Sequence, residues 1–463
     1  MNIQRKLKEL GYNSVPQSFY TTIRMWKEWY DGNVHDFHNY SVYNGIEYLD
    51  CHRYSVGMGK KVCEDWASLL LNEKVVITLE GEKEQAFVDG VLLDNNFRVK
   101  GNELQERKAA LGTSAIVPSV EGIVATEIGE IVKTGRIRLN YCSAPTIYPL
   151  TWDNGIITEC AFVSEWRDSG KEYTYMQIHR KDENDLYVIE NRAFEGTKEI
   201  SVSTLPGYES VPEVINTGSD KPQFVVDRLN IANPDENNPM GISVFACAID
   251  QLKGVDIAYD GYVNEFVLGK KRIVVKPEAT KTIDGKPIFD ARETVYYALP
   301  EDSSSGSVME PVDMTLRTAE FNAGIQDMLN VLSSKCGFGE NHYKYDNGNV
   351  STATQVISEN SSLFRNVKKH ELILEDMLID LCRIILRMGN KYMGAGLDED
   401  VEISIDFDDS IIEDNEADFN RDARLLQMGI MNDWEFRAKW MNEDEETAKA
   451  ALPKMEQLVS DGV

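Results

Sequence analysis

Two short clusters of potential metal ligands are the clearest candidates for chemistry in this sequence. HDFH at residues 35–38 spaces two imidazoles three residues apart, and DFDDSIIED at residues 406–414 concentrates carboxylates of the kind that a two-metal nuclease uses. The histidine pair lacks an accompanying cluster of cysteines or carboxylates, so we expect a solvated loop there. Nuclease acids converge from separate elements, whereas a contiguous acidic run usually faces water. A metal-dependent nuclease or morphogenesis enzyme using residues 406–414 therefore stays the alternative interpretation.

Other signatures of catalysis are missing from the sequence. No GxGxxG motif, Walker loop or GxSxG motif stands in a suitable context. The seven cysteines contain no CxxC pair, and an odd number of scattered thiols in a long chain indicates reduced cysteines rather than a zinc site or a disulfide framework. We therefore expect no enzyme activity, no catalytic residues, no cofactor and no bound metal.

The charge of the chain also restricts its partners. Its 463 residues carry a formal net charge of -29, and about half of that charge lies in residues 398–463. Affinity for nucleic acid comes mainly from cations that neutralise phosphates, so a strongly acidic protein is expected to hold DNA poorly. No apolar run approaches the roughly 18 residues of a membrane span, and the N-terminus shows no apolar secretion segment. These features predict a cytoplasmic product of about two to four domains with no membrane partner.

The first half of the chain reads as helices followed by an antiparallel sheet. Residues 1–30, 54–71 and 102–111 show helical spacing of apolar side chains, and VVITLEG reads as a strand. Residues 112–215 hold successive β-rich runs separated by turns such as DNG and DSG, which is typical of a meander. The sequence therefore predicts an α+β fold.

The second half is dominated by helices. Asn238 and Pro239 suggest the cap and first position of a helix that runs to about residue 268 and contains Gly254 and Gly261. Each interior glycine costs roughly 1 kcal/mol against alanine, which is tolerable where another helix packs closely or the helix bends. A break into two pieces is the other interpretation.

Further elements follow this helix in a recognisable order. They are a small β-like unit at 270–312, a helix at about 315–336, a polar glycine-bearing loop at 337–350, a helix of roughly 38 residues opening at Ser351, a strand in VEISIDF, and two or three short acidic helices. Within the last region, Asn432 and Glu435 form a capping-box-like pair, and Gly429 is a natural helix stop.

This order of elements resembles that of the portal proteins of tailed bacteriophages, especially those of long-tailed phages of Gram-positive hosts. The resemblance covers nearly the whole chain. It rests on local matches that are loose singly and fairly specific in their order and spacing: WKEWYDG, DWASLLLNE, NPMGISVFACAIDQLKGVDIAYD, FVLGKKRIVV, STATQV, FDDSIIED and QMGIMNDWEFRAKWM.

The resemblance implies a portal-type fold with an α/β wing, a two-helix stem, a small α/β clip, a long spanning helix and a helical C-terminal crown. The implied parts are a wing at 1–237 with an antiparallel β-rich middle, a first stem helix at 238–269, a clip at 270–314, a second stem helix at 315–336, a tunnel loop at 337–350, a long wing helix at 351–390, a wing strand and connection at 391–413, and an acidic crown at 414–463.

The resemblance also implies a function and partners. Portal proteins form a ring, normally of twelve subunits, at one vertex of the capsid, so the product would be made in the host cytoplasm and end in the virion. The ring would conduct double-stranded DNA, touching it transiently and without sequence preference, during packaging and ejection. Its expected partners are the major capsid protein, the terminase large subunit and an adaptor or connector protein. A monomeric acidic binding module is the third interpretation.

Three sets of residues are expected to serve that function. An acidic wall would keep DNA from sticking, and the candidates for its lining are Asp250, Asp256, Asp260 and Glu265. The expected tunnel-loop contacts are His342, Tyr343, Lys344, Tyr345 and Asn347. Lys270, Lys271 and Arg272 would dock the terminase or adaptor at the clip; a solvated edge strand guarded by lysine is the alternative for these three.

Overall fold

The structure of the chain is a computed structural model. The residues that it describes are 2–122, 124–125, 131–133, 135–269, 272–275, 282–283, 286–287, 296–298, 309–312, 315–344, 353–407, 415–441 and 443–451.

The N-terminal part is mainly helical, as the apolar spacing predicts. Its elements are α1 (Ile3–Glu9), α2 (Gln17–Tyr30), α3 (His35–His38), β1 (Asn39–Tyr43), β2 (Tyr48–His52), α4 (Met58–Leu70), β3 (Val76–Leu79), α5 (Glu82–Asp94) and α6 (Phe97–Leu111). The inward faces of α2, α4 and α6 supply large buried side chains, among them Trp26, Trp66 and Leu104. Strands β1 and β2 form a separate two-stranded antiparallel hairpin.

Two antiparallel sheets follow. The first has the order β14-β4-β7 and the second the order β12-β11-β10-β9-β8, with β13 beside β11. Their bounds are β4 (Thr113–Glu121), β7 (Arg136–Ser143), β8 (Ile147–Asp153), β9 (Ile156–Asp168), β10 (Lys171–Lys181), β11 (Tyr187–Glu195), β12 (Lys198–Ile200), β13 (Val214–Asn216) and β14 (Val225–Arg228), and a short pair is formed by β5 (Val124–Ala125) and β6 (Ile131–Lys133).

The turns of the meander are those that the sequence predicts. Asn154 and Gly155 join β8 to β9, and Ser169 and Gly170 join β9 to β10. All four residues have positive φ, which two-residue hairpin loops of the favoured type require. The predicted antiparallel meander is therefore confirmed.

The next helix starts later than the sequence suggests. Asn238 does not cap a helix: its side chain accepts a hydrogen bond from the Met240 amide. The Gly241 amide donates to the Thr113 hydroxyl, and the Val244 amide donates to the Ala109 carbonyl. Residues 241–244 therefore bind to β4 and α6 and are not part of a helix. After a 3₁₀ turn, α7 spans Ile249–Leu268, a length of about 30 Å.

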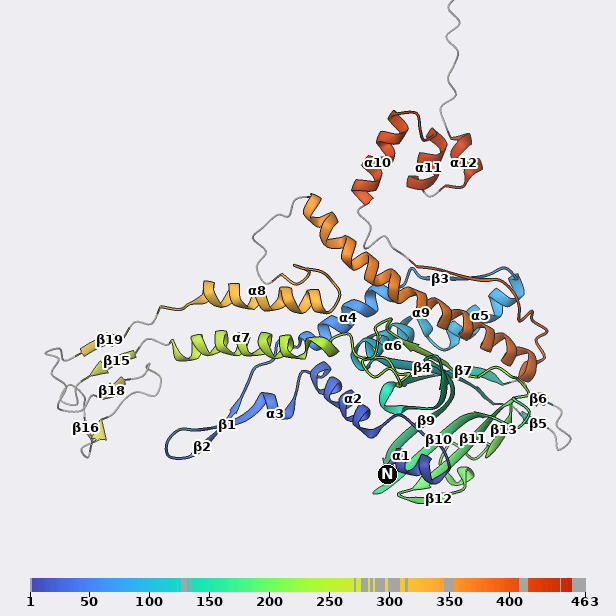
Figure 1. The fold of residues 1–463 in the computed structure, drawn as a ribbon, viewed down its shortest axis with the longest axis horizontal. Coiled ribbons are helices and arrows are strands. Elements are labelled where there is room, and N and C mark those ends of the chain that lie inside the picture. Colours follow the sequence, from blue (N-terminus) through green and yellow to red (C-terminus); the bar gives the residue numbers. More distant parts are fainter. Residues whose placement is uncertain are drawn as a thin grey trace, which may run out of the picture.

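Helices α7 and α8 (Thr318–Lys335) lie side by side and project from the rest of the molecule (Figure 1). Short strands lie beyond their far end: β15 (Arg272–Val275), β16 (Thr282–Ile283), β17 (Lys286–Pro287), β18 (Tyr296–Ala298) and β19 (Met309–Val312). Strand β15 pairs with β18 in parallel and with β19 in antiparallel orientation.

The long helix predicted after residue 351 is α9, which spans Ala353–Met393 and crosses the body of the molecule (Figure 1). Its second half supplies buried residues such as Leu378, Leu381 and Ile385. Strand β20 (Ile403–Asp406) then pairs with β3 from the N-terminal part. Three short helices end the described chain: α10 (Asn415–Gln427), α11 (Asp433–Met441) and α12 (Glu445–Ala450). The Asn432 amide donates to the Glu435 side chain, and Gly429 has a positive φ, so both predicted signals are confirmed.

Candidate assembly and channel surfaces

The two glycines of α7 face α8. A Cβ atom on Gly254 would lie 3.2 Å from the Met328 Sδ, and one on Gly261 would lie 3.1 Å from a ring carbon of Phe321. Because glycine lacks a Cβ, the two helix backbones can approach closely at both positions. Close packing against α8 thus offsets the cost of placing glycine inside a helix. Helix α7 is one continuous helix rather than two pieces.

Polar contacts at both ends fix the two helices as an antiparallel pair. At the far end, Arg317 donates to the Glu265 carboxylate at 2.9 and 3.1 Å. At the near end, Lys335 Nζ donates to the carbonyl of Cys247 at 3.2 Å. The hydrogen bonds from Arg317 lower the pKa of Glu265, so this carboxylate is ionised but paired.

Two of the four acids expected to line a channel are instead buried in the protein. Asp256 accepts hydrogen bonds from the Val56 amide at 2.8 Å and from His38 Nε2 at 3.1 Å. The His38 Nδ1 accepts from the Val34 amide, which places the ring proton on Nε2. Asp260 accepts from the Tyr54 amide at 3.1 Å. These carboxylates hold the segment around β1 and β2 against α7, and a channel-lining role does not fit them.

Asp250 remains accessible. Its side chain is 86% exposed in the first turn of α7, where Lys253 lies 3.3 Å away. A carboxylate in the first turn of a helix also interacts favourably with the helix dipole. Asp250 is therefore the member of the predicted acidic set that the fold leaves open to solvent, whereas the side chain of Glu265 is only 16% exposed in its pair with Arg317.

The first part of the predicted tunnel loop is anchored to α4. The Tyr343 hydroxyl donates to Asp65 Oδ2 at 3.0 Å, and His342 Nε2 lies 3.8 Å from the same oxygen. The His342 ring stacks on the buried Phe338 at a centroid distance of 4.4 Å. Tyr343 is thus partly buried by this anchor, and its expected contact with DNA stays a prediction. Lys344 ends the described part, and Tyr345 and Asn347 lie outside the described residues.

The electrostatics of this anchor favour an ionised Asp65. Burial alone would raise its pKa, but the nearby His342 ring and the hydrogen bonds from Lys61 and Tyr343 outweigh burial and hold the pKa of Asp65 below its ordinary value. Burial, followed by the charge of Asp65, raises the pKa of the Tyr343 phenol. The phenol therefore stays protonated and donates.

Sequence reasoning missed the residues of α4 and α9 that hold the start of this loop. Trp66 Nε1 donates to the Cys336 carbonyl at 2.9 Å, and Asn366 Nδ2 donates to the Gly337 carbonyl at 2.7 Å. The sequence shows Trp66 only as one of several apolar positions on a helix. Its partner lies 270 residues away along the chain, so no local signal points to it.

The predicted clip residues are only partly within the described chain. Lys270 and Lys271 lie outside the described residues, and Arg272 opens β15. The partner-docking role of these three residues stays a prediction.

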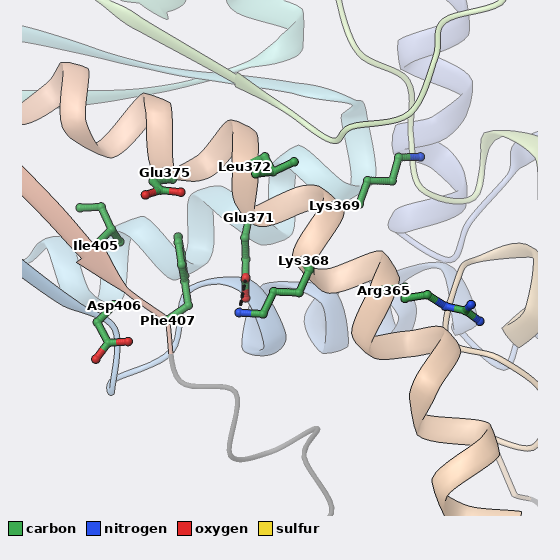
Figure 2. A pocket seen from close by; sticks show the side chains of 9 residues that line it. All are labelled: Arg365, Lys368, Lys369, Glu371, Leu372, Glu375, Ile405, Asp406 and Phe407. Atoms are coloured by element: carbon green, nitrogen blue, oxygen red, sulfur yellow. Dashed lines mark ion pairs between the residues drawn. The ribbon is translucent and has the colours of Figure 1, made fainter.

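The acidic run at 406–414 begins at the edge of a shallow depression between α9 and β20 (Figure 2). The depression has a volume of about 520 Å³ and is lined by Arg365, Lys368, Lys369, Glu371, Leu372, Glu375, Ile405, Asp406 and Phe407. An ion pair of 3.1 Å joins Lys368 to Glu371. This lining offers no histidine, cysteine or hydroxyl nucleophile. Residues 408–414 lie outside the described chain.

No metal centre or membrane span is found among the residues that the structure describes. No group of three or more histidine, cysteine or acidic side chains is placed there to hold a metal ion. The two imidazoles of HDFH diverge: His38 is buried against Asp256, whereas the side chain of His35 is 86% exposed. None of the described helices combines the length and apolar character needed to cross a bilayer.

Comparison with protein families gives the class of this chain. The family model described as phage portal protein, SPP1 Gp6-like, matches residues 15–457. The chain therefore belongs to this phage portal protein family. The match supports a portal or connector role, as the resemblance in the sequence suggests, whereas the host of the phage stays a prediction.

Solved structures of similar shape are more distant. The virion of a native gene transfer agent particle contains a chain with 10% identity and a TM-score of 0.39, over 95% of this chain and 96% of that one. The neck of the same kind of particle, computed with C12 symmetry, contains one with 10% identity and a TM-score of 0.37, over 82% and 88%. No curated protein matches the sequence.

Proposed function

We propose that this protein forms a ring, normally of twelve subunits, that occupies one vertex of a phage capsid and conducts double-stranded DNA during packaging and ejection. The observation that carries the proposal is the family match over residues 15–457. The projecting pair α7–α8 supports it, because a rigid antiparallel pair with a small strand unit at its end is suited to the stem and clip of such a ring.

The surface of the stem fits passage of DNA rather than retention. Asp250 is exposed on α7, and the charge of the nearby Lys253 is offset by it. A protein that neutralised several phosphates would bind DNA strongly and in a salt-dependent way, which would oppose translocation. Residues 337–350 are proposed as the part nearest the DNA, with Lys344, Tyr345 and Asn347 as candidates. His342 and Tyr343 stay candidate contacts as well, and they also anchor this segment to α4.

Docking of the other particle components completes the proposal. The major capsid protein would contact the wing, and the terminase large subunit and an adaptor would dock at the clip, where Lys270, Lys271 and Arg272 gather positive charge.

Ring formation is tested by light scattering coupled to size-exclusion chromatography and by negative-stain electron microscopy of the purified protein. We expect annular particles with a central hole and a mass that is a multiple of 52.4 kDa. A monomer at all concentrations and salt conditions would overturn the proposal. Subunit number is a weaker criterion, since recombinant rings of this kind can differ in it.

The DNA path is tested with a thiol label. Asn347→Cys would be introduced after the exposed Cys247 and the partly exposed Cys51 and Cys142 are replaced by serine. We expect a bulky maleimide at position 347 to block packaging, while the same label on Leu93→Cys in α5, which is 81% exposed, should not. Normal packaging by a fully labelled ring would place the loop away from the DNA.

A further inference from the structure

The two sides of the α7–α8 pair differ in chemical character. Gly254 and Gly261 of α7 face α8, whereas Asp256 and Asp260 face the chain at the root of the β1–β2 hairpin. The hairpin and α8 therefore lie on opposite sides of α7, as Figure 1 also shows. One side of the pair is formed by α8, and the other by α7 together with the hairpin.

The hairpin side of the pair is rich in exposed apolar groups. Val267 of α7 lies two helical turns beyond Asp260 and is 51% exposed. On the hairpin, Tyr43 and Tyr48 face each other across the strands and are 57% and 74% exposed. Exposed apolar groups of this kind are typical of protein contacts, and they are poorly suited to the wall of a water-filled channel.

The side of α8 that faces away from α7 is polar. Helix α8 turns Phe321 and Met328 toward the two glycines of α7. Glu320 and Asp327 are seven residues apart, so two helical turns bring both carboxylates to the same side, about 10 Å apart along the helix. Val331, which is 47% exposed, lies at the edge of this side. The exposed residues away from α7 are otherwise small or acidic: Glu320, Ala323, Asp327 and Ser334.

Positive charge on α8 is confined to its two ends. Residues 318–334 contain no lysine or arginine. The preceding Arg317 is paired with Glu265, and the Nζ of Lys335 donates to the Cys247 carbonyl. The side of α8 that carries Glu320 and Asp327 is therefore electronegative along its length.

The chain passes from α8 directly into residues 337–350, which are proposed to lie nearest the DNA. Cys336 alone separates this segment from Lys335, the last residue of α8. From this continuity and from the charge of the helix, we infer that α8 forms the inner wall of the ring. Glu320 and Asp327 then face the DNA duplex, and α7 and the hairpin stand behind them. The inference rests on the proposed function, because it presupposes a ring that conducts DNA.

A wall of this kind favours sliding over binding. Symmetry repeats each carboxylate around the channel, so Glu320 and Asp327 form two acidic rings about 10 Å apart. Their repulsion of phosphates extends over roughly 8 Å at physiological salt, and no counterions are released to hold the duplex. The acidic lining thus moves from α7, where Asp256 and Asp260 are buried, to α8.

Charge reversal tests this wall. Glu320→Lys with Asp327→Lys changes two exposed side chains, so rings should still assemble, which electron microscopy would check. We expect the reversed rings to bind a linear DNA duplex at least about tenfold more tightly than wild-type rings at low salt, with a smaller difference at high salt.

Helix α5 offers a matched control for the reversal. Glu82→Lys with Asp89→Lys reverses the same two residue types, which are also exposed and seven residues apart. Glu82 lies in the first turn of α5, as Glu320 does in α8. Because the change in net charge is identical, only the position of the charges differs. We expect the control rings to bind DNA much as wild-type rings do.

A thiol label provides a second measurement. Asp327→Cys would be made in a background in which Cys51, Cys142 and Cys247 are serine. A bulky maleimide at position 327 should block DNA packaging by assembled rings, whereas the same label on Asp89→Cys should not.

The outcomes separate this assignment from the proposed function. Equal DNA affinity of the two charge-reversed rings, or normal packaging by rings fully labelled at position 327, would overturn α8 as the inner wall and leave the ring standing. Absence of rings in the wild-type protein would overturn both.

Discussion

Lys108 on α6 and Asp227 on β14 form an ion pair of 3.0 Å in which both side chains are fully buried. Gln105 donates to the same carboxylate oxygen at 2.8 Å. Burial lowers the pKa of Lys108, and the charge of Asp227 offsets part of that effect. The pair joins α6 to β14, and the charge of Lys108 also acts on His370 of α9.

Removal of one partner of this pair should be far more harmful than removal of both. We expect Lys108→Ala to lower the free energy of unfolding by about 3–5 kcal/mol, because it leaves a buried carboxylate without a counter-charge. The double variant Lys108→Met with Asp227→Leu should recover most of the loss, since apolar groups of similar volume carry no desolvation cost. Urea unfolding of the two variants and the wild type measures this. Equal losses in the single and double variants would contradict the electrostatic explanation.

Packing of α7 against α8 should depend on Gly261. Gly261→Leu places a side chain against Phe321, and overpacking of this kind costs about 1–3 kcal/mol. Gly254→Leu should act in the same direction with a smaller effect, because the flexible Met328 can move. Gly324→Leu on α8 is the matched control: a Cβ there meets nothing within 4 Å, and the change should be neutral or stabilising. Thermal unfolding and ring yield would measure the three variants, and similar values for all of them would argue against close packing at the α7 glycines.

Stability should fall as the solution becomes acidic because of buried histidines. His179 packs between Phe162 and Phe224, and burial lowers its pKa to about 3; burial also lowers the pKa of His370 to about 3. The folded protein keeps these rings neutral, whereas the unfolded chain binds protons below about pH 6.5. The contribution of the two histidines to the free energy of unfolding is therefore fully present above that pH. It is lost as the pH falls toward 3, at about 1.4 kcal/mol per pH unit for each histidine.

His179→Phe should remove one histidine's share of this loss. The comparison is urea unfolding of the variant and the wild type at about pH 7.5 and about pH 4.5, which brackets the expected window. The exposed His35 offers a matched control, and His35→Phe should leave the acid loss unchanged. An unaltered slope in His179→Phe would show that this ring is already protonated in the folded protein.

The anchor of residues 337–344 should loosen when the phenol is removed. Tyr343→Phe deletes the hydrogen bond to Asp65, and a bond to a charged acceptor contributes about 1.5–3 kcal/mol. We expect faster amide hydrogen exchange in this segment by at least about tenfold, with the rest of α4 unaffected. Glu64→Gln, beside the anchor and without a contact to Tyr343, is the control. Unchanged exchange would mean that the packing of Phe338 alone holds the segment.

The basic residues 270–272, which are proposed to lie at the start of a clip, should affect docking rather than assembly. Replacing Lys270, Lys271 and Arg272 together by serine should leave the ring intact and weaken terminase binding, with the larger difference at low salt because exposed charges are screened by ions. Pull-down of the terminase large subunit and DNA packaging measure the effect. Normal packaging by the triple variant would indicate a solvated edge strand.

The features that the sequence predicted well are those encoded by neighbouring residues. Asn154 and Gly155 specify a hairpin turn by their own backbone preferences, and the apolar periodicity of α9 extends over many turns. Asp256 was misjudged because an aspartate on a helix is normally exposed, and its partners lie 200 and 218 residues away. The anchoring of Tyr343 was likewise not predicted, because its partner Asp65 is 278 residues distant. Local patterns thus give elements and turns, whereas the burial of a polar group depends on tertiary partners that no local pattern contains.

The hydrogen bond from Lys335 to the Cys247 carbonyl joins the end of α8 to the residues just before α7. The segment from residue 247 to residue 335 therefore begins and ends at the same place in the fold. Such a segment can lengthen, shorten or be exchanged as a cassette while the wing sheets and the β3–β20 pairing keep their connections. Under the proposed function, a change confined to this segment would alter what docks at its far end and leave the rest of the fold unchanged.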